Sequence, residues 1–547
     1  MNFLENNKNV AWIFLLLVVV IYGQTLWGDY VFDDRGIVNL YEALKNPFAL
    51  KQIFLLPYAA IEAGLYRPVA LLTYSLNFLF TGTSAFGFHL VNITLYWLLC
   101  FSIFQFLEKL LKNRTFALAT SFLFLTLPIH SEVVANIIGR AEIMALLFSI
   151  LLLKELLNEK INHYKVGLFL FLALGSKETA IAVLPIALLV ICLHEKYNLA
   201  DFTLTAKNIT SKYLYPTLAS LTATVFYFCL RLIVLGREHF VGIETTIVEN
   251  QLMFTDGFSR FYTALQVLAM YLGKSIVPIN LCSDYSYSQI ATAHSIWQME
   301  SLLGLAVLIF LAFSILYFVR KRPEISLGSA IFLFSFLPVS NLIFPIGTIA
   351  GERLMFFPSL GLCMFFAYFA LKLHSFLKLR WPTNSNLAKI FYILFISILA
   401  LYSLVSITRS RVWLSEKRLF TNASICAPKS VLSTSNLGTV YYIDGNLKEA
   451  EEVLLQSVDI YPKYSKGLNN LGLVYWKMGE IEKAKEFYLK AMATDFPYPG
   501  AYENMALLYL SQGDLVNGRK WLMQFFSSNK QMVDQYIRNL TRNNYSY

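Results

Sequence analysis

The stretch that decides the fold is VAWIFLLLVVVIYGQTLW, residues Val10–Trp27, followed by the polar run GDYVFDDR, residues Gly28–Arg35. The first stretch carries no charged residue, and a helix needs about 20 mostly apolar residues to cross a bilayer. An aspartate at mid-bilayer costs about 2.5–3.5 kcal/mol on insertion scales. We therefore expect Asp33 and Asp34 outside the hydrocarbon, at the exit of the first membrane helix.

The composition of the whole chain supports a polytopic membrane protein. The 547 residues are 56% hydrophobic and 15% charged, with a mean hydropathy of +0.53, whereas soluble domains carry about 25% charged residues. The net charge of +10 comes from Lys and Arg in short segments between apolar runs, which is typical of cytoplasmic loops and not of nucleic-acid binding. Because no small-residue cleavage site follows Trp27, the first run is interpreted as an uncleaved signal anchor.

The six cysteines are scattered and form no CxxC pair. Most lie in or near apolar runs, so we interpret them as small core residues and expect no disulfide framework and no structural zinc site. They are Cys100, Cys192, Cys229, Cys282, Cys363 and Cys426.

The charges of the loops predict an all-α membrane domain with about eleven full spans, its N-terminus cytoplasmic and its C-terminus outside. Two runs, Val166–Gly175 and Ala180–Leu193, are read as short or tilted spans that turn around Ser176–Glu178. The basic residues Arg320–Arg322 are expected on the cytoplasmic side of the membrane. A full crossing by the segment Phe258–Ile279 would place them outside, so this segment is expected to be re-entrant or interfacial.

From about Ser430 the composition becomes that of a soluble protein, and a 34-residue repeat begins. This period and pattern are typical of tetratricopeptide repeats, helical pairs whose arrays bind peptides in a concave groove. The chain is therefore divided into a membrane domain over 1–410 with a first outer loop at 28–85, a linker over 411–430 and repeats over 431–547. The positions in phase are Asn436, Asn470 and Asn504; Tyr441, Tyr475 and Tyr509; Gly445, Gly479 and Gly513; and Ala450 and Ala484.

The expected topology gathers ionisable residues on the outer face, where such groups at the edge of spans tend to be functional. Each has an ordinary alternative: an arginine that anchors a loop to headgroups, a histidine that caps the next helix, or a Lys177–Glu178 ion pair within one turn. Asp33 and Asp34 favour function, because two adjacent like charges repel and need a partner. The others are Arg67, His130, Glu132, Arg140, Glu142, Lys177, Glu178, Glu352 and Arg353.

This set suits sugar transfer from a lipid phosphate. Arg and Lys hold a phosphate and stabilise it as a leaving group, and a carboxylate takes the proton of an acceptor hydroxyl. Direct attack with one base inverts the anomeric centre. The second carboxylate then raises the pKa of the first, orients it, or holds a divalent metal together with groups such as His130 and Glu132, and the sequence leaves these roles open.

Eight short motifs follow one another along nearly the whole chain: Phe32–Asp34, Tyr66–Pro68, Phe88–Asn92, Pro128–Val134, Gly139–Glu142, Ser176–Glu178, Gly351–Arg353 and Pro358–Gly361. This order resembles the family of transmembrane and tetratricopeptide-repeat O-mannosyltransferases and, more broadly, the GT-C glycosyltransferases. No Trp-Trp-Asp motif of oligosaccharyltransferases is present.

The resemblance implies a GT-C core, a dolichyl- or polyprenyl-phosphate sugar donor and a Ser or Thr acceptor. Asp33 or Asp34 would be the base, His130 and Glu132 would line the pocket, and Arg67, Arg140, Lys177 or Arg353 would handle the phosphate. About three repeats are present, fewer than in the long eukaryotic members. A chain this short suggests a prokaryotic homologue in the plasma membrane, whose donor sugar and acceptor need not be mannose and protein, while a eukaryotic one would lie in the endoplasmic reticulum. A membrane-anchored repeat scaffold without catalysis and a transporter are the alternatives.

Overall fold

The structure is a computed structural model that describes residues 2–59, 63–195, 202–238, 240, 245–381 and 385–542. In these ranges the chain is helical and forms no β-strand, as the sequence predicts. It divides into two compact units, each treated by itself below. The membrane unit comprises Met1–Thr245, Leu252–Ser283 and Thr292–Leu419, and the repeat unit comprises Thr246–Gln251, Asp284–Ala291 and Phe420–Tyr547.

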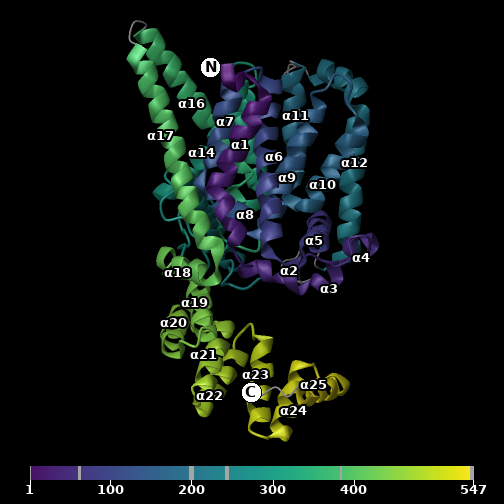
Figure 1. Cartoon of the computed structure of the whole chain (residues 1–547), viewed down its shortest axis with the longest axis vertical. Coiled ribbons are helices and arrows are strands. Elements are labelled where there is room, and N and C mark those ends of the chain that lie inside the picture. The colour runs from purple at the N-terminus through teal and green to yellow at the C-terminus, as the bar shows by residue number, and fades with distance from the viewer. Residues whose placement is uncertain are drawn as a thin grey trace. The chain divides into compact units, whose positions relative to one another are not determined.

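The membrane unit is a bundle in which α1, α6, α7 and α9 pack side by side (Figure 1). Short helices α2 to α4 follow the first span and lie near one end of the bundle (Figure 1). The helices are α1 (Asn7–Tyr22), α2 (Arg35–Asn39), α3 (Tyr41–Leu44), α4 (Leu50–Phe54), α5 (Pro68–Thr81), α6 (Ala85–Leu111), α7 (Arg114–Thr126), α8 (Ser131–Ala135), α9 (Arg140–Leu156), α10 (His163–Ser176), α11 (Val183–His194), α12 (Phe202–Leu235), α13 (Gly257–Ile276), α14 (Met299–Tyr317), α15 (Pro323–Phe336), α16 (Pro358–Arg380), α17 (Ser385–Ser410) and α18 (Glu416–Cys426), which continues into the repeat unit.

Short 3-10 helices sit at the ends of these elements and carry most of the candidate site residues. They are η1 (Asn2–Glu5), η2 (Gly23–Trp27), η3 (Phe32–Asp34), η5 (Pro128–His130), η6 (Ile137–Gly139), η7 (Glu178–Ala182), η8 (Gln251–Phe254), η9 (Leu337–Val339), η10 (Glu352–Met355) and η11 (Arg411–Leu414).

The eleven predicted full spans are not supported. Within the described residues, six helices are long and apolar enough to cross a membrane, or seven if the bent pair α7 and η5–α8 forms one span. Three shorter apolar helices accompany them, Pro68–Thr81, Glu178–His194 and Pro323–Val339, whereas a membrane span typically has about 20 residues. The six are Asn7–Trp27, Ala85–Leu111, Lys212–Leu235, Met299–Tyr317, Pro358–Arg380 and Lys389–Leu414.

The first and last of these spans are joined by polar contacts near their ends. The amide Nε2 of Gln24 donates to the carbonyl of Ile407 at 2.6 Å and to Oγ of Ser410 at 2.7 Å. Nearby, the backbone N–H of Asp29 donates to the carbonyl of Leu414 at 3.1 Å. The start of the first outer loop is therefore fixed to the end of α17 and to η11.

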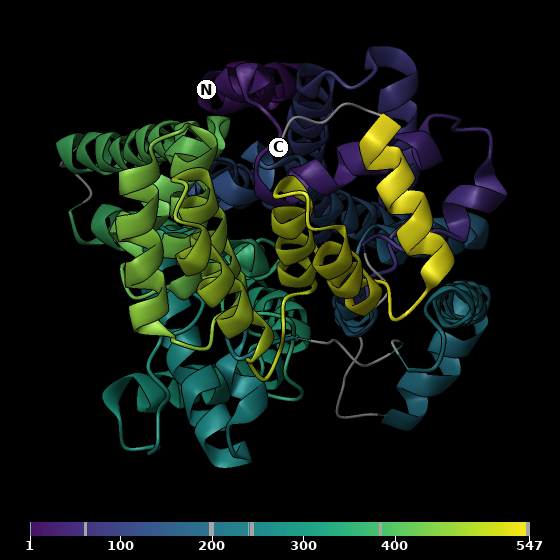
Figure 2. The same ribbon diagram turned by 90° about the horizontal axis from the view of Figure 1, so that it is seen from below.

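The repeat unit consists of antiparallel helical pairs, seen from two directions in Figures 1 and 2. The predicted turn glycines Gly445, Gly479 and Gly513 have φ values of +80°, +84° and +80°, the left-handed region that glycine adopts without strain. Ala450 and Ala484 are fully buried between the helices, as the pattern predicts. The helices are α19 (Val431–Ile443), α20 (Leu447–Ile460), α21 (Ser465–Lys477), α22 (Ile481–Met492), α23 (Pro499–Ser511), α24 (Leu515–Phe525) and α25 (Lys530–Arg542).

Residues far upstream in the sequence complete the start of the repeat unit. The carboxylate of Asp284 accepts hydrogen bonds from the hydroxyls of Ser286 and Ser433, both at 2.9 Å. The backbone N–H of Val431 donates to the carbonyl of Tyr287 at 2.7 Å. The backbone N–H groups in the first turn of a helix have no partners within the helix, and residues 284–291 supply such partners for α19. These residues are therefore part of the first repeat.

The expectation that the chain has no disulfide was wrong. Cys282 and Cys426 are disulfide-bonded, whereas Cys100, Cys192, Cys229 and Cys363 are free. No spacing motif marks either of these two cysteines in the sequence, so pattern alone could not identify them as bonded.

Candidate functional site

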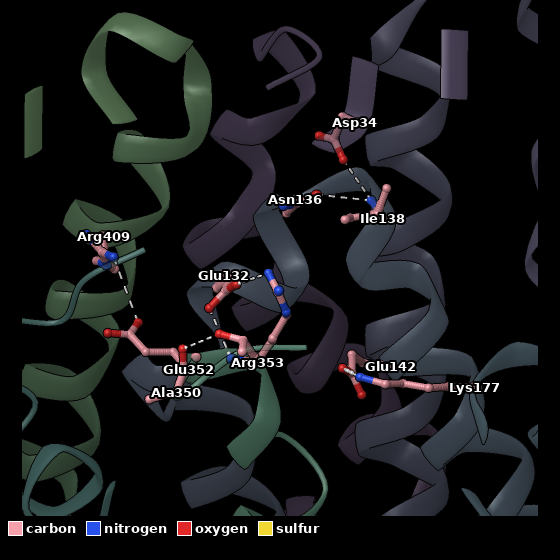
Figure 3. Close-up of polar contacts among 12 residues, drawn as sticks. Asp34, Glu132, Asn136, Ile138, Glu142, Lys177, Ala350, Glu352, Arg353 and Arg409 are labelled. Atoms are coloured by element: carbon pink, nitrogen blue, oxygen red, sulfur yellow. Dashed lines mark hydrogen bonds and ion pairs between the residues drawn. The ribbon is translucent and has the colours of Figure 1, made fainter. Parts of the chain in front are cut away.

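The first outer loop is held by Asp34, whose side chain is buried. Its carboxylate accepts hydrogen bonds from the backbone N–H groups of Ile137 at 3.1 Å and Ile138 at 2.9 Å (Figure 3). These donors lie at the first turn of η6, where backbone N–H groups lack helical partners and favour a negative charge. Asp34 is therefore an anchor that fixes the loop to the start of η6 and α9.

Burial raises the pKa of Asp34 to about 7, although the backbone N–H groups that it accepts from lower it. The native state then binds this proton more tightly than the unfolded chain, where the pKa of aspartate is about 3.9. The contribution of Asp34 to stability is therefore present below about pH 4 and is lost as the pH rises toward about 7.

We expect the thermal midpoint of the purified protein to fall across this pH window through the titration of Asp34. Differential scanning fluorimetry of the wild type and of Asp34→Asn, which does not titrate, measures the contribution of Asp34. An equal fall in both proteins would contradict the assignment.

Asp33 differs from its neighbour because its side chain is exposed. Its charge acts on Arg353. Burial lowers the pKa of the Arg353 guanidinium, but the carboxylates of Glu132 and then of Asp33 raise this pKa above its ordinary value. The structure thus separates the two acids: Asp34 is buried and accepts from the backbone, whereas Asp33 is exposed and within electrostatic range of Arg353.

Arg353 lies in η10 and is fixed by Glu132 of α8. Its Nη1 donates to Oε1 of Glu132 at 3.0 Å, and its backbone N–H donates to Oε2 at 3.0 Å (Figure 3). The side chain of Glu132 is 2% exposed and that of Arg353 is 33% exposed. Within the described part of the chain, Nε and Nη2 of Arg353 have no protein partner, so part of the fork is available to a ligand.

Lys177 and Glu178 each form an ion pair with a residue of another element, and not with each other. Lys177 forms a salt bridge with Glu142 on α9 (Figure 3), while Glu178 accepts from Nε and Nη2 of Arg67 at 3.2 and 3.1 Å. The guanidinium of Arg67 also lies 5.0 Å from the ring centroid of Tyr58. The proposed local ion pair at this turn is therefore wrong, and the pairs instead join α5, α9 and η7.

The three cations Arg67, Lys177 and Arg353 share one neighbourhood. Burial lowers the pKa of Lys177 well below its usual range, and the charges of Arg67 and Arg353 lower it further. Glu178 and Glu132 oppose this effect. Such a cluster of hydrogen-bonded cations suits an anionic group such as a phosphate.

Two predicted site residues lie inside the protein and are fully engaged there. Arg140 is buried and donates to Asn92 at 2.8 Å, to Asn77 at 2.6 Å and to the carbonyl of Phe88 at 2.9 Å. His130 is buried between Tyr96 at 3.0 Å and Ser359 at 2.7 Å. Both residues connect helices, and this geometry favours a structural role over contact with a donor phosphate.

Glu352, next to Arg353, is also buried. It accepts from the backbone N–H of Cys282 and lies 3.9 Å from the guanidinium of Arg409 at the end of α17 (Figure 3). It fixes the backbone that carries Arg353. Arg409 and Tyr58 are neighbours of the site that the sequence did not identify, because nothing in their local context distinguishes them.

The sequence considered Asp33, Asp34, His130 and Glu132 as metal ligands. Within the described residues, no group of three or more His, Cys, Asp or Glu side chains is placed to hold a metal ion. Asp34 and His130 use their polar atoms on protein partners.

Comparison with known proteins gives consistent matches. A tetratricopeptide-repeat family model matches residues 430–495. A protein O-mannosyl-transferase of Caenorhabditis elegans is 30% identical over 467 residues, covering 83% of this chain and 63% of the relative. The human protein O-mannosyl-transferases TMTC1 and TMTC3 are 26% and 25% identical, covering 82% and 83% of this chain and 54% and 52% of their own length.

These relatives are animal proteins, and a prokaryotic origin stays a prediction. The chain spans between about half and two thirds of the length of the curated relatives that it matches. The helical bundle, the tetratricopeptide repeats and the sequence similarity together make this chain similar to the transmembrane and tetratricopeptide-repeat protein O-mannosyl-transferases.

Proposed function

We propose that this chain is a membrane glycosyltransferase that transfers a mannosyl group from a polyprenyl- or dolichyl-phosphate to a Ser or Thr hydroxyl of a protein. The relatives are protein O-mannosyl-transferases by name. The observation that carries the proposal is the exposed carboxylate of Asp33 beside the partly open guanidinium of Arg353. A base and a phosphate-binding cation in one place are the two groups that this transfer requires.

The reaction follows from these positions. The acceptor oxygen attacks the anomeric carbon opposite the phosphate, forming the new C–O bond while the bond from carbon to the phosphate oxygen breaks. Asp33 takes the proton of the acceptor hydroxyl. The phosphate leaves with the bonding electron pair, and Arg353 stabilises its added charge through Nε and Nη2. One displacement inverts the anomeric centre.

The remaining residues support this pair. Arg67 and Lys177 form the positive surroundings of the donor phosphate, while Glu178 and Glu142 fix their side chains through the salt bridges. Asp34 holds the loop that carries Asp33, and Glu132 orients Arg353. Glu132 accepts from Nη1 of the Arg353 guanidinium, so its other N–H groups can bind a phosphate.

We place the site on the extracytoplasmic face of a multi-pass protein with a GT-C-type core. The guanidinium of Arg114 donates to the carbonyl of Leu4 at 3.0 and 2.7 Å, so the N-terminus shares one end of the bundle with the basic turn after α6. Basic turns favour the cytoplasm, and the bonded Cys282 and Cys426 favour an oxidising compartment. The repeats, on this reading, bind the acceptor polypeptide.

The test is direct transfer by the full chain in lipid nanodiscs. Dolichyl-phosphate-mannose and a Ser/Thr-rich peptide are supplied, and mass spectrometry detects a gain of one hexose on the peptide. The Asp33→Asn variant in identical nanodiscs is the negative control. NMR of the product compares its anomeric configuration with that of the donor.

Transfer by the wild type alone, with an inverted product, supports the proposal. Repeat-dependent capture of a partner with no covalent product would favour the scaffold. Uptake of a substrate into vesicles with no covalent product would favour a transporter.

A further inference from the structure

We propose that Glu416, the first residue of α18, is a positioning residue that sets the backbone of Asp33 for proton transfer. The inference rests on the proposed function, since it assigns a role within that site. Neither the sequence pattern nor the family motifs of the chain point to this residue, which lies 383 positions after Asp33.

Glu416 contacts the loop on both sides of the two aspartates. Its Oε1 accepts from the backbone N–H of Phe32 at 3.3 Å, and its Oε2 lies 2.6 Å from Nη2 of Arg35. The side chain of Glu416 is 17% exposed, whereas that of Arg35 is 58% exposed. The ion pair with the exposed arginine contributes little by itself, so the contact with the Phe32 backbone is the one that fixes the loop.

Phe32 needs such a contact because its backbone is strained. Its φ is +56°, in the left-handed region that non-glycine residues rarely occupy. A conformation of this kind persists only when the surrounding structure enforces it. The conformation at Phe32 determines the direction in which the next residue, Asp33, leaves the chain.

The loop is anchored from the opposite side by Asp34. Its carboxylate accepts from the N–H groups of Ile137 and Ile138, so Asp33 lies between two fixed neighbours. Two anchors on two different elements, η6 and α18, define the position of the exposed acid more closely than either one alone. A base must come within about 3 Å of the proton that it abstracts, and a misplacement of about 1 Å lowers a rate by about 100-fold.

We expect Glu416→Ala to lower kcat by about 10- to 100-fold with little change in the KM for dolichyl-phosphate-mannose. The KM is spared because Glu416 contacts the loop of the base and has no contact with Arg67, Lys177 or Arg353. Glu416→Gln keeps an oxygen that can accept from Phe32 and loses the charge, so its kcat should lie between those of the wild type and of the alanine variant. Arg418→Ala, at an exposed position on the same helix, is the matched control.

A second pair of variants tests the strain itself. Glycine adopts a positive φ without strain, so Phe32→Gly combined with Glu416→Ala should recover at least about 5-fold of the lost kcat. Phe32→Ala combined with Glu416→Ala removes the same ring and keeps the strain, so it should recover nothing. Equal rates in the two double variants would overturn the proposal.

Hydrogen–deuterium exchange gives a readout that does not need activity. Peptides covering residues 28–40 should exchange faster in Glu416→Ala than in the wild type or in Arg418→Ala. Unchanged exchange, or faster exchange with a wild-type kcat, would overturn the positioning role. If the wild type transfers no sugar at all, the proposed function fails, while faster exchange would still show that Glu416 holds the loop.

Discussion

Asp33→Asn should lower kcat for sugar transfer by about 100- to 10,000-fold, the usual contribution of a general base. An amide cannot take the proton of the acceptor hydroxyl. Because the Asp33 side chain is exposed, its replacement removes no buried group, and the folded protein should be preserved. Steady-state transfer at saturating dolichyl-phosphate-mannose in nanodiscs measures kcat, and scanning fluorimetry of the same samples measures stability.

Asp34→Asn is the matched comparison and should behave in the opposite way. Its new NH₂ group would face the N–H of Ile137 or Ile138, and a buried donor left without an acceptor costs about 1–3 kcal/mol. We therefore expect a lower thermal midpoint and a smaller loss of kcat per folded molecule. Full activity of Asp33→Asn, with loss of transfer only in Asp34→Asn, would reverse the roles of the two acids.

Arg353→Lys should lower kcat/KM for the lipid donor by about 100- to 1,000-fold, comparable to the loss of one donor that stabilises a developing negative charge. Lysine keeps a positive charge next to Glu132 but lacks the planar fork that presents Nε and Nη2 to a phosphate. The lysine variant is preferred to alanine, because alanine would leave the buried Glu132 carboxylate unpaired, which costs about 3–5 kcal/mol.

Glu132→Gln is the control for this prediction. It weakens the ion pair but keeps Nε and Nη2 of Arg353, so the loss of kcat/KM should be smaller than in Arg353→Lys. Initial rates at several donor concentrations, with a fixed peptide acceptor, measure both variants. A wild-type kcat/KM in Arg353→Lys would remove Arg353 from the phosphate site.

Local pattern predicted the parts of the fold that depend on near neighbours in the chain. The 34-residue period gave the positions of Gly445, Gly479 and Gly513, because a helical hairpin repeats its turn and its crossing point at fixed spacing. The long apolar run before the two aspartates gave the first span for the same reason. The loop charges predicted eleven spans, whereas six or seven helices of the described residues are long and apolar enough, because shorter apolar helices such as Pro323–Val339 resemble spans in sequence.

The roles of the individual site residues depend on long-range contacts, which the spacing of residues along the sequence does not show. Lys177 and Glu178 are neighbours in sequence, and each pairs with a residue of another element. Arg140 and His130 share the outer-face context of Arg353, and the structure buries both in hydrogen-bonded networks. The sequence alone does not distinguish Arg140 and His130 from Arg353 as ligand-binding residues, because the burial of a side chain depends on how the helices pack.

The sequence by itself determined that Asp33 and Asp34 follow the first apolar span together, in one polar loop. Only the tertiary structure distinguished them: Asp34 meets the N–H groups of η6, and Asp33 stays exposed beside Arg353. Asp33 and Asp34 are the same residue type at nearly the same distance from the first span, so their local sequence predicts the same environment for both. Their roles differ because residues 34 and 137 are joined by folding, and Glu416 joins the same loop from 384 positions after Phe32.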